Sequence, residues 1–203
     1  MVIKLIISDL AGVLTENGDI LLFEQLQELF PNKPFKKMEE VFSKHMLLAE
    51  RGEVSEWDFL HAFLEEMSLD SQDVDKIQQL RRDATKTNPE MISFIKKLRM
   101  AGYKLGYATN CSEEEIIHNE KVLGLSGLFD FGLASCDTKC RKTDPEIFRK
   151  IVGHFEGVKF EEVVYMDDNV KYVGVAKELG IHAIHFKSLE QAKIELQKLG
   201  VDV

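Results

Sequence analysis

Several side chains of this 203-residue sequence have the types and spacing needed to handle a phosphate group. They are Asp9, Thr109, Asn110, Lys142, Asp167 and Asp168. A carboxylate such as Asp9 can act as a nucleophile and form an aspartyl intermediate. Attack on a phosphate dianion also needs positive charge, which a lysine ammonium or a Mg²⁺ ion held by carboxylates can supply. The residue types therefore indicate phosphoryl transfer with Asp9 as the nucleophile.

Each of these residues also has an ordinary structural explanation. An Asp at the end of a strand is usually a turn former, and Asp-Asp-Asn before a helix is often a cap. A lone lysine is usually a solvated surface residue. What favours a joint site is that all of these residues follow expected strands, so they would meet at one edge of one sheet.

The pattern along the chain predicts that sheet. Residues 2–8 (VIKLIIS) are β-branched and apolar, which is typical of a buried strand. From about residue 90, expected helices alternate with expected strands at residues 103–109, 129–135, 162–167 and 181–186. Strands that alternate with helices imply parallel pairing with right-handed crossovers. We therefore expect an α/β fold with a Rossmann-like parallel sheet, which binds ligands at the carboxyl ends of its strands.

A helical segment interrupts this pattern after the first strand. Residues 20–30 and 34–50 have helical periodicity, Ser55 is placed to cap a third helix, and a fourth is expected over residues 70–83. The sequence thus predicts an α/β core made of residues 1–15 and 87–203. Residues 16–86 would form an inserted helical cap.

The composition limits the partners. The net charge of −9 lacks the basic footprint of a nucleic-acid binder. No stretch approaches the roughly 20 apolar residues of a membrane span, and no secretory signal is evident. The chain has three cysteines, a count that does not suggest a disulfide framework. We expect a cytoplasmic protein, with a monomer favoured although the oligomeric state is not fixed.

The motifs resemble those of the haloacid dehalogenase superfamily. "IISDLAGVL" is similar to its first motif, "GYATN" to its second, "RKTDPEIF" to its third and "VVYMDDNVKYVGVAKELGIHAI" to its fourth. The segment "ERGEVSEWDF" also resembles a cap segment of the subgroup that contains alpha-glucose-1-phosphatase-like phosphatases and the N-terminal phosphatase domain of soluble epoxide hydrolase. The resemblance covers the whole chain.

This resemblance implies a role for each site residue. Asp9 would be the nucleophile and a Mg²⁺ ligand, with the backbone carbonyl of Ala11 as a second ligand. Asp168 would bind Mg²⁺ directly, and Asp167 would bind it through water. The phosphoryl group would be held by Thr109 and Lys142, with help from Asn110. The substrate would be a small phosphorylated metabolite, whose identity the sequence does not give.

Ala11 departs from the family pattern, because family phosphatases usually have at this position an Asp that protonates the leaving group and then activates water. One interpretation is a phosphatase whose activity is limited by the leaving group. A second is a non-catalytic relative that binds phosphate or metal. A third is a haloacid dehalogenase, since halide leaves without a proton. That third interpretation is disfavoured because the paired acids Asp167 and Asp168 would repel the Asp9 charge in a metal-free site.

The three cysteines stand near the same predicted edge. Cys111 follows Asn110 directly, and Cys136 and Cys140 precede Lys142. A redox-sensitive or zinc-binding cluster is one interpretation, and three reduced, half-buried thiols is the other. C-x₃-C plus one distant cysteine is a weak zinc signature.

Overall fold

The structure is a computed structural model, and it describes residues 2–202. Five parallel strands form one sheet in the order β3-β2-β1-β4-β5. The strands are β1 (Leu5–Ser8), β2 (Lys104–Thr109), β3 (Phe131–Ala134), β4 (Val163–Asp167) and β5 (His182–His185). The first strand of the chain lies at the centre, and the order reverses beside it. The expected α/β fold with a Rossmann-like sheet is confirmed.

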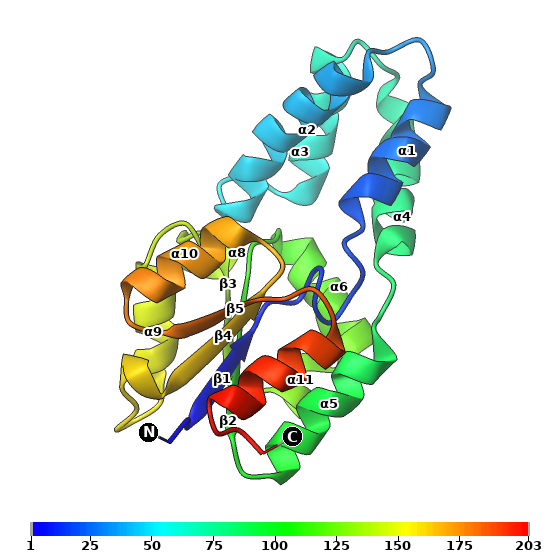
Figure 1. The fold of residues 1–203 in the computed structure, drawn as a ribbon. Helices are drawn as coiled ribbons and strands as arrows, with labels where there is room; N and C mark the ends of the chain where they lie inside the picture. Colours follow the sequence, from blue (N-terminus) through cyan, green and yellow to red (C-terminus); the bar gives the residue numbers. More distant parts are fainter. Residues whose placement is uncertain (1, 203) are drawn as a thin grey trace.

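Helices cover both faces of the sheet, as Figure 1 shows. They are α5 (Pro89–Met100), α6 (Glu113–Leu123), α7 (Leu125–Leu128), α8 (Ser135–Thr138), α9 (Glu146–His154), α10 (Val170–Glu178) and α11 (Leu189–Lys198), with a 3₁₀ turn at Phe160–Glu162. The two short helices α7 and α8 interrupt segments that the sequence pattern assigns to loops. The longer helices of the core lie where the pattern predicts them.

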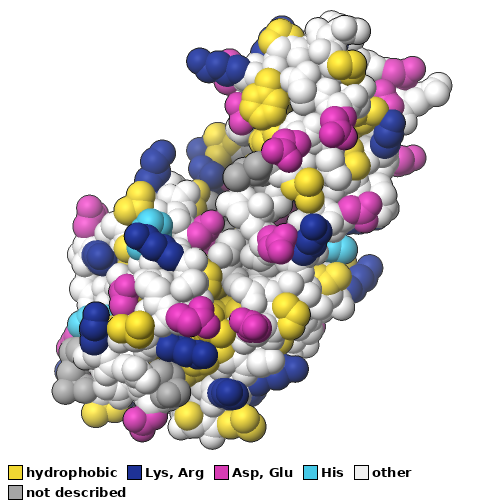
Figure 2. Space-filling view, turned by 45° about the vertical axis from the view of Figure 1, so that its right-hand side comes forward, with side chains coloured by type: hydrophobic (Ala, Val, Ile, Leu, Met, Phe, Trp, Pro, Cys, Tyr) yellow, Lys and Arg dark blue, Asp and Glu magenta, His cyan; other side chains and the backbone are white. Residues whose placement is uncertain are grey.

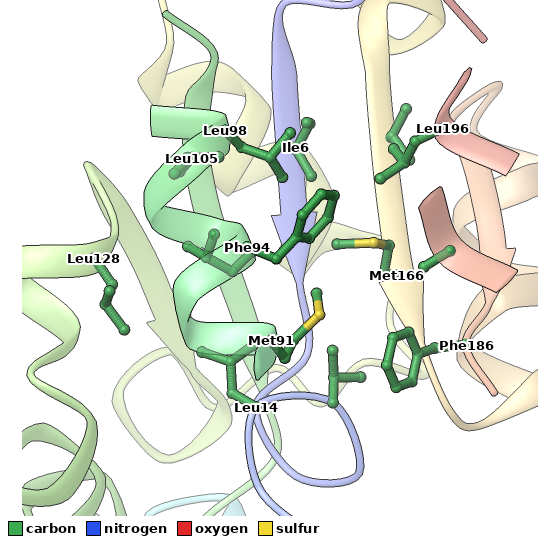
Figure 3. Close-up of a cluster of buried hydrophobic side chains, with 14 of the residues drawn as sticks. Ile6, Leu14, Met91, Phe94, Leu98, Leu105, Leu128, Met166, Phe186 and Leu196 are labelled. Carbon is green, nitrogen blue, oxygen red and sulfur yellow. The ribbon is translucent and has the colours of Figure 1, made fainter. Parts of the chain in front are cut away.

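Alternation along the strands divides the core into two apolar layers. Ile6 packs in a cluster with Phe94 and Leu98 of α5 and Leu196 of α11, which Figure 3 shows in close-up. Its neighbours Leu5 and Ile7 point to the opposite face, against α9 and α10. Successive side chains of a strand face opposite sides, so the continuous apolar run of β1 fills both layers. β1 is therefore held on both faces and carries Asp9 on a rigid base.

Four further helices form a separate bundle beyond the carboxyl edge of the sheet (Figure 1). They are α1 (Asp19–Leu29), α2 (Phe35–Glu50), α3 (Glu56–Glu66) and α4 (Val74–Ala84), and a 3₁₀ turn at Ser71–Asp73 precedes α4. Phe42 lies at the bundle centre, with edge-on contacts to the rings of Phe23, Phe59 and Phe63 at 5.3–5.4 Å. The bundle thus has its own apolar core.

The beginning of α3 shows why the sequence pattern is informative there. The Ser55 hydroxyl oxygen accepts the Asp58 N–H at 3.1 Å, and the Asp58 carboxylate accepts the Ser55 N–H at 3.3 Å. This reciprocal capping box satisfies two backbone N–H groups at the start of the helix that have no partner within the helix. The predicted N-cap role of Ser55 is confirmed.

The two chain segments that join the bundle to the sheet run side by side. The N–H of Glu16 donates to the carbonyl of Lys86, and the N–H of Asn88 donates to the carbonyl of Leu14, both at 2.8 Å. Thr15 and Thr87 form an antiparallel bridge between them. The bundle is therefore attached through a paired, two-chain connection. Among the helices of residues 2–202, none has both the length and the apolar character needed to cross a bilayer.

Candidate active site

A pocket of about 200 Å³ opens between the carboxyl edge of the sheet and the helical bundle. Its lining includes all of the sequence-predicted site residues except Asp167, namely Asp9, Ala11, Thr109, Asn110, Lys142 and Asp168. These residues are far apart in the sequence, since 159 positions separate Asp9 from Asp168. The carboxyl ends of β1, β2 and β4 bring them together with Lys142, which lies in the loop after β3 and α8, as parallel strand ends do at a topological switch point.

Three carboxylates meet at the base of the pocket, two in its lining and the third buried beneath them. Asp9, Asp167 and Asp168 each offer an oxygen, and these oxygens lie within 4.8 Å of one another. Hard divalent cations such as Mg²⁺ prefer oxygen ligands of this kind. The Lys142 ammonium balances the charge of only one of the three carboxylates, so the donor set fits a bound divalent ion.

Lys142 is buried between two of these carboxylates. Its Nζ lies 2.5 Å from Oδ2 of Asp9 and 2.9 Å from Oδ2 of Asp167. Burial alone would lower the pKa of Lys142, but the Asp9 and Asp167 charges outweigh it and raise this pKa above its ordinary value. The ammonium is therefore a permanent positive charge beside Asp9.

Opposing effects determine the pKa of the Asp9 carboxyl group. Burial raises the pKa of Asp9 to about 7, the Lys142 charge acts against this rise, and the Asp167 charge adds to it. The backbone N–H of Leu10 donates to Oδ1 of Asp9 at 2.7 Å, which fixes the carboxylate orientation. A metal cation next to Asp9 would add to the effect of Lys142 and further favour the ionised form of the carboxylate.

Asp167 lies beneath the pocket, completely buried at the end of β4. Its carboxylate accepts hydrogen bonds from Lys142, from the Tyr165 hydroxyl and, at 2.7 Å, from the backbone N–H of Asn169. The sequence motifs do not identify Tyr165 as a partner of Asp167. Because Tyr165 precedes Asp167 by two positions on one strand, both point to the same face, and that spacing is the signal that could have found it.

Asp168 is placed by the loop that follows β1. A Cβ on Gly12, whose φ is +76°, would stand 2.2 Å from Oδ2 of Asp168. Only glycine adopts this backbone conformation readily and leaves room for the carboxylate. Asn17 donates to Oδ2 of Asp168 at 3.2 Å, and the Asp168 carbonyl lies 2.9 Å from Nε2 of His185. Asn17 and His185 are further site neighbours that the motifs do not identify.

The Asn110 amide, which lines the pocket, makes two hydrogen bonds to other parts of the protein. Its Oδ1 accepts the backbone N–H of Lys142 at 2.9 Å, and its Nδ2 donates to the Tyr172 hydroxyl at 3.0 Å. The Tyr172 ring lies under the Lys142 ammonium, with its centroid 4.6 Å from Nζ. Asn110 therefore positions the lysine loop, while Thr109, which is buried and lines the pocket, stands beside it.

Ala11 is exposed on the wall of the pocket, in the turn bridged to Thr15. A longer side chain at this position would therefore extend into the cavity. Ala11 itself supplies no ionisable side chain to this wall.

Polar contacts join the bundle to the sheet domain around the pocket. Glu56 of α3 accepts from the Ser112 hydroxyl at 3.0 Å, and Arg81 of α4 pairs with Glu56 at 3.2 Å and with Glu115 of α6 at 3.1 Å. Glu50 pairs with Arg141 at 2.6 Å. The sequence does not predict these pairings, because contacts between distant segments leave no local sequence signal. In Figure 2 acidic and basic side chains alternate over the visible face of both parts.

Comparison with known proteins finds similarity to hydrolases. A family model described as haloacid dehalogenase-like hydrolase matches residues 3–180. Flavin mononucleotide hydrolase 1 of Arabidopsis thaliana is 32% identical over 84 residues, which are 41% of this chain and 34% of that protein. A phosphorylated carbohydrates phosphatase of Thermotoga maritima is 32% identical over 103 residues, 49% of this chain and 46% of that protein. The chain thus matches less than half the length of these curated relatives.

Solved structures share the fold. A HAD family enzyme from Bacteroides thetaiotaomicron superposes with a TM-score of 0.78 at 22% identity, over 93% of this chain and 96% of that chain. The same enzyme has been solved with magnesium and with magnesium and inorganic phosphate. Identity this low establishes the shared fold alone.

Proposed function

This chain belongs to the haloacid dehalogenase-like hydrolase family, and from that premise we propose that it is a Mg²⁺-dependent phosphatase of small phosphomonoesters. The observation that carries the proposal is the arrangement of charged side chains at the base of the pocket. There Asp9 points its carboxylate at the buried Lys142 ammonium, within 4.8 Å of the other two acids. A nucleophile, a fixed cation and a metal-binding donor set together suit phosphoryl transfer better than any other common reaction.

The proposed roles follow from these contacts. Asp9 attacks phosphorus, the P–O bond of the ester breaks and its alcohol or phenol leaves, and water then hydrolyses the aspartyl-phosphate to inorganic phosphate and free Asp9. When bound, Mg²⁺ neutralises charge on the transferring phosphoryl group. Asp9, Asp168 and the Ala11 carbonyl would hold the ion directly, and Asp167 would hold it through water, which fits its buried carboxylate. Thr109 and Lys142 would bind the phosphoryl oxygens, and Asn110 would keep Lys142 in position.

The substitution at position 11 sets the expected substrate range. No carboxylate at Ala11 protonates the leaving group, so esters with acidic leaving groups are the best substrates. The related proteins named above as a flavin mononucleotide hydrolase and a phosphorylated carbohydrates phosphatase favour a small phosphorylated metabolite. We further propose that residues 16–86 act as a cap over a core of residues 1–15 and 87–203. The thiols, which are all free, suit a cytoplasmic location.

The experiment is a metal-dependent hydrolysis assay. Purified protein is incubated with p-nitrophenyl phosphate and with alkyl phosphates, with Mg²⁺ or with excess chelator, beside Asp9→Asn as an isosteric control. We expect Mg²⁺-dependent release of p-nitrophenol that Asp9→Asn abolishes. Chloride release from 2-chloropropionate without metal would instead identify a dehalogenase. Mg²⁺ and phosphate binding without turnover of any ester would identify a non-catalytic relative.

A further inference from the structure

Two cysteines that the proposed chemistry does not use lie side by side next to the pocket. Strands β2 and β3 pair up to Thr109 and Ala134, and the two chains stay together beyond that point. The N–H of Cys111 donates to the Ser135 hydroxyl oxygen at 3.1 Å. Cys111 and Cys136 then pack with Ala134 in one small cluster. A disulfide needs two cysteines whose Cα atoms lie roughly 4.4–6.8 Å apart, and Cys111 and Cys136 are brought together because each follows the paired end of a strand by two residues.

The two thiols differ in their surroundings. Cys111 is 1% exposed and Cys136 is 8% exposed, so an oxidant reaches Cys136 first. The two thiols influence each other directly, which raises the pKa of Cys111 well above its ordinary value and lowers the pKa of Cys136. A thiol with a lowered pKa has more of the reactive thiolate form. Cys136 thus has the properties of an attacking thiol, and Cys111 those of a resolving one.

We propose that Cys111 and Cys136 form a reversible disulfide that makes this site sensitive to oxidants. The oxidant is a hydroperoxide. The Cys136 sulfur attacks one peroxide oxygen, the O–O bond breaks, and Cys136 becomes a sulfenic acid as hydrogen peroxide is reduced to water. The Cys111 sulfur then attacks the Cys136 sulfur, the S–O bond breaks, and a second water leaves with the Cys111 proton. Two thiols lose two electrons and two protons in total.

Disulfide formation would act on the pocket through the adjoining loops. Cys111 directly follows Asn110, whose Oδ1 holds the Lys142 backbone. On the other side, a Cβ on Gly52 would stand 2.4 Å from the Cys136 carbonyl oxygen, so the turn after α2 rests on Cys136. The bond draws the sulfur atoms to about 2.0 Å and shifts both contacts. This consequence, unlike the disulfide itself, rests on the proposed phosphatase function. Displacements of about 1 Å can cost up to ~10²-fold in rate.

Peptide mapping after oxidation tests the disulfide without any activity. The reduced full-length protein is treated with hydrogen peroxide, blocked with N-ethylmaleimide and digested with trypsin. Cleavage after Lys104, Lys121 and Lys139 puts each cysteine in a different peptide. We expect residues 105–121 joined to residues 122–139, and their release by dithiothreitol. In Cys111→Ser, the join is lost and dimedone labels Cys136 as a sulfenic acid.

Cys140 provides the control, because it is more exposed and its sulfur lies 3.8 Å from the Lys150 ammonium. Cys140→Ser should leave the cross-link unchanged. A cross-link to Cys140, or free Cys111 and Cys136 after Cys140 has been oxidised, would overturn the proposal. Mg²⁺-dependent hydrolysis of p-nitrophenyl phosphate should fall about tenfold or more on cross-linking and recover with dithiothreitol. Unchanged turnover in fully cross-linked protein would overturn the coupling to the pocket. A reduced protein that hydrolyses no ester would refute the phosphatase alone, because the peptide map decides the disulfide.

Discussion

Replacing Lys142 with methionine measures how strongly the buried ammonium stabilises the site. Methionine keeps most of the side-chain volume and removes the charge that lies 2.5 Å from Asp9 and 2.9 Å from Asp167. Removing one partner of a buried ion pair costs about 3–5 kcal/mol, because the other charge stays buried without compensation. We expect the lower value of about 3 kcal/mol, since protonation of Asp9 relieves part of the repulsion. For a chain of this size that corresponds to a fall in Tm of roughly 6–12 °C.

Thermal unfolding followed by circular dichroism, without metal, measures this cost. Lys139→Met is the matched control, because Lys139 lies in the same loop and is exposed; its Tm should change little. A double-mutant cycle with Asp9→Asn measures the coupling between Lys142 and Asp9. In that background Lys142→Met should cost about 1–3 kcal/mol less, since one of the stranded carboxylates is already neutral. Equal costs in both backgrounds would refute the ion-pair reasoning.

Other positions give further expected outcomes. Ala11→Asp, compared with Ala11→Asn, should speed single-turnover hydrolysis of alkyl phosphates by ~10²–10⁴-fold, as general acids do; no gain would show that another group already donates the proton. Gly12→Ala should weaken Mg²⁺ binding at least about tenfold by calorimetry, because its Cβ would meet Asp168 at 2.2 Å. Gly102→Ala is the control, because Gly102 is also at positive φ but faces open space, and it should leave Mg²⁺ affinity unchanged. Equal Mg²⁺ affinities in the two variants would contradict the packing argument. Phe42→Ala should destabilise the protein by about 3–5 kcal/mol in chemical denaturation, and a cost below about 1 kcal/mol would contradict its central place in the bundle.

Much of the fold could be predicted because the relevant signals are local. Apolar runs mark β1 and β4, and a capping box marks the start of α3. Parallel topology then brings the ends of distant strands together, which is why Asp9 and Asp168 could be placed in one site from the sequence. The short helices α7 and α8 could not be predicted, because four residues are too few to show a period.

The contacts around the site were harder to predict than its residues. Arg81 pairs with Glu56 and Glu115 across the boundary between the bundle and the sheet, and nothing near any of the three in sequence signals it. The sequence also gives no sign that the Asn110 amide holds the Lys142 backbone. Such partners depend on the relative placement of loops, which the sequence pattern leaves open.

The central claim is that Asp9 takes the phosphoryl group in a site whose residue 11 lacks the usual acid/base. A rapid-quench experiment with p-nitrophenyl phosphate and Mg²⁺ tests it most directly. p-Nitrophenolate leaves without a proton, but the aspartyl-phosphate then waits for water that no carboxylate at Ala11 activates. We predict a burst of one p-nitrophenol per enzyme and, by mass spectrometry of the quenched protein, one phosphoryl group on Asp9. Ala11→Asp should shorten the life of that intermediate. Steady turnover with neither a burst nor a phosphorylated Asp9 would contradict the account.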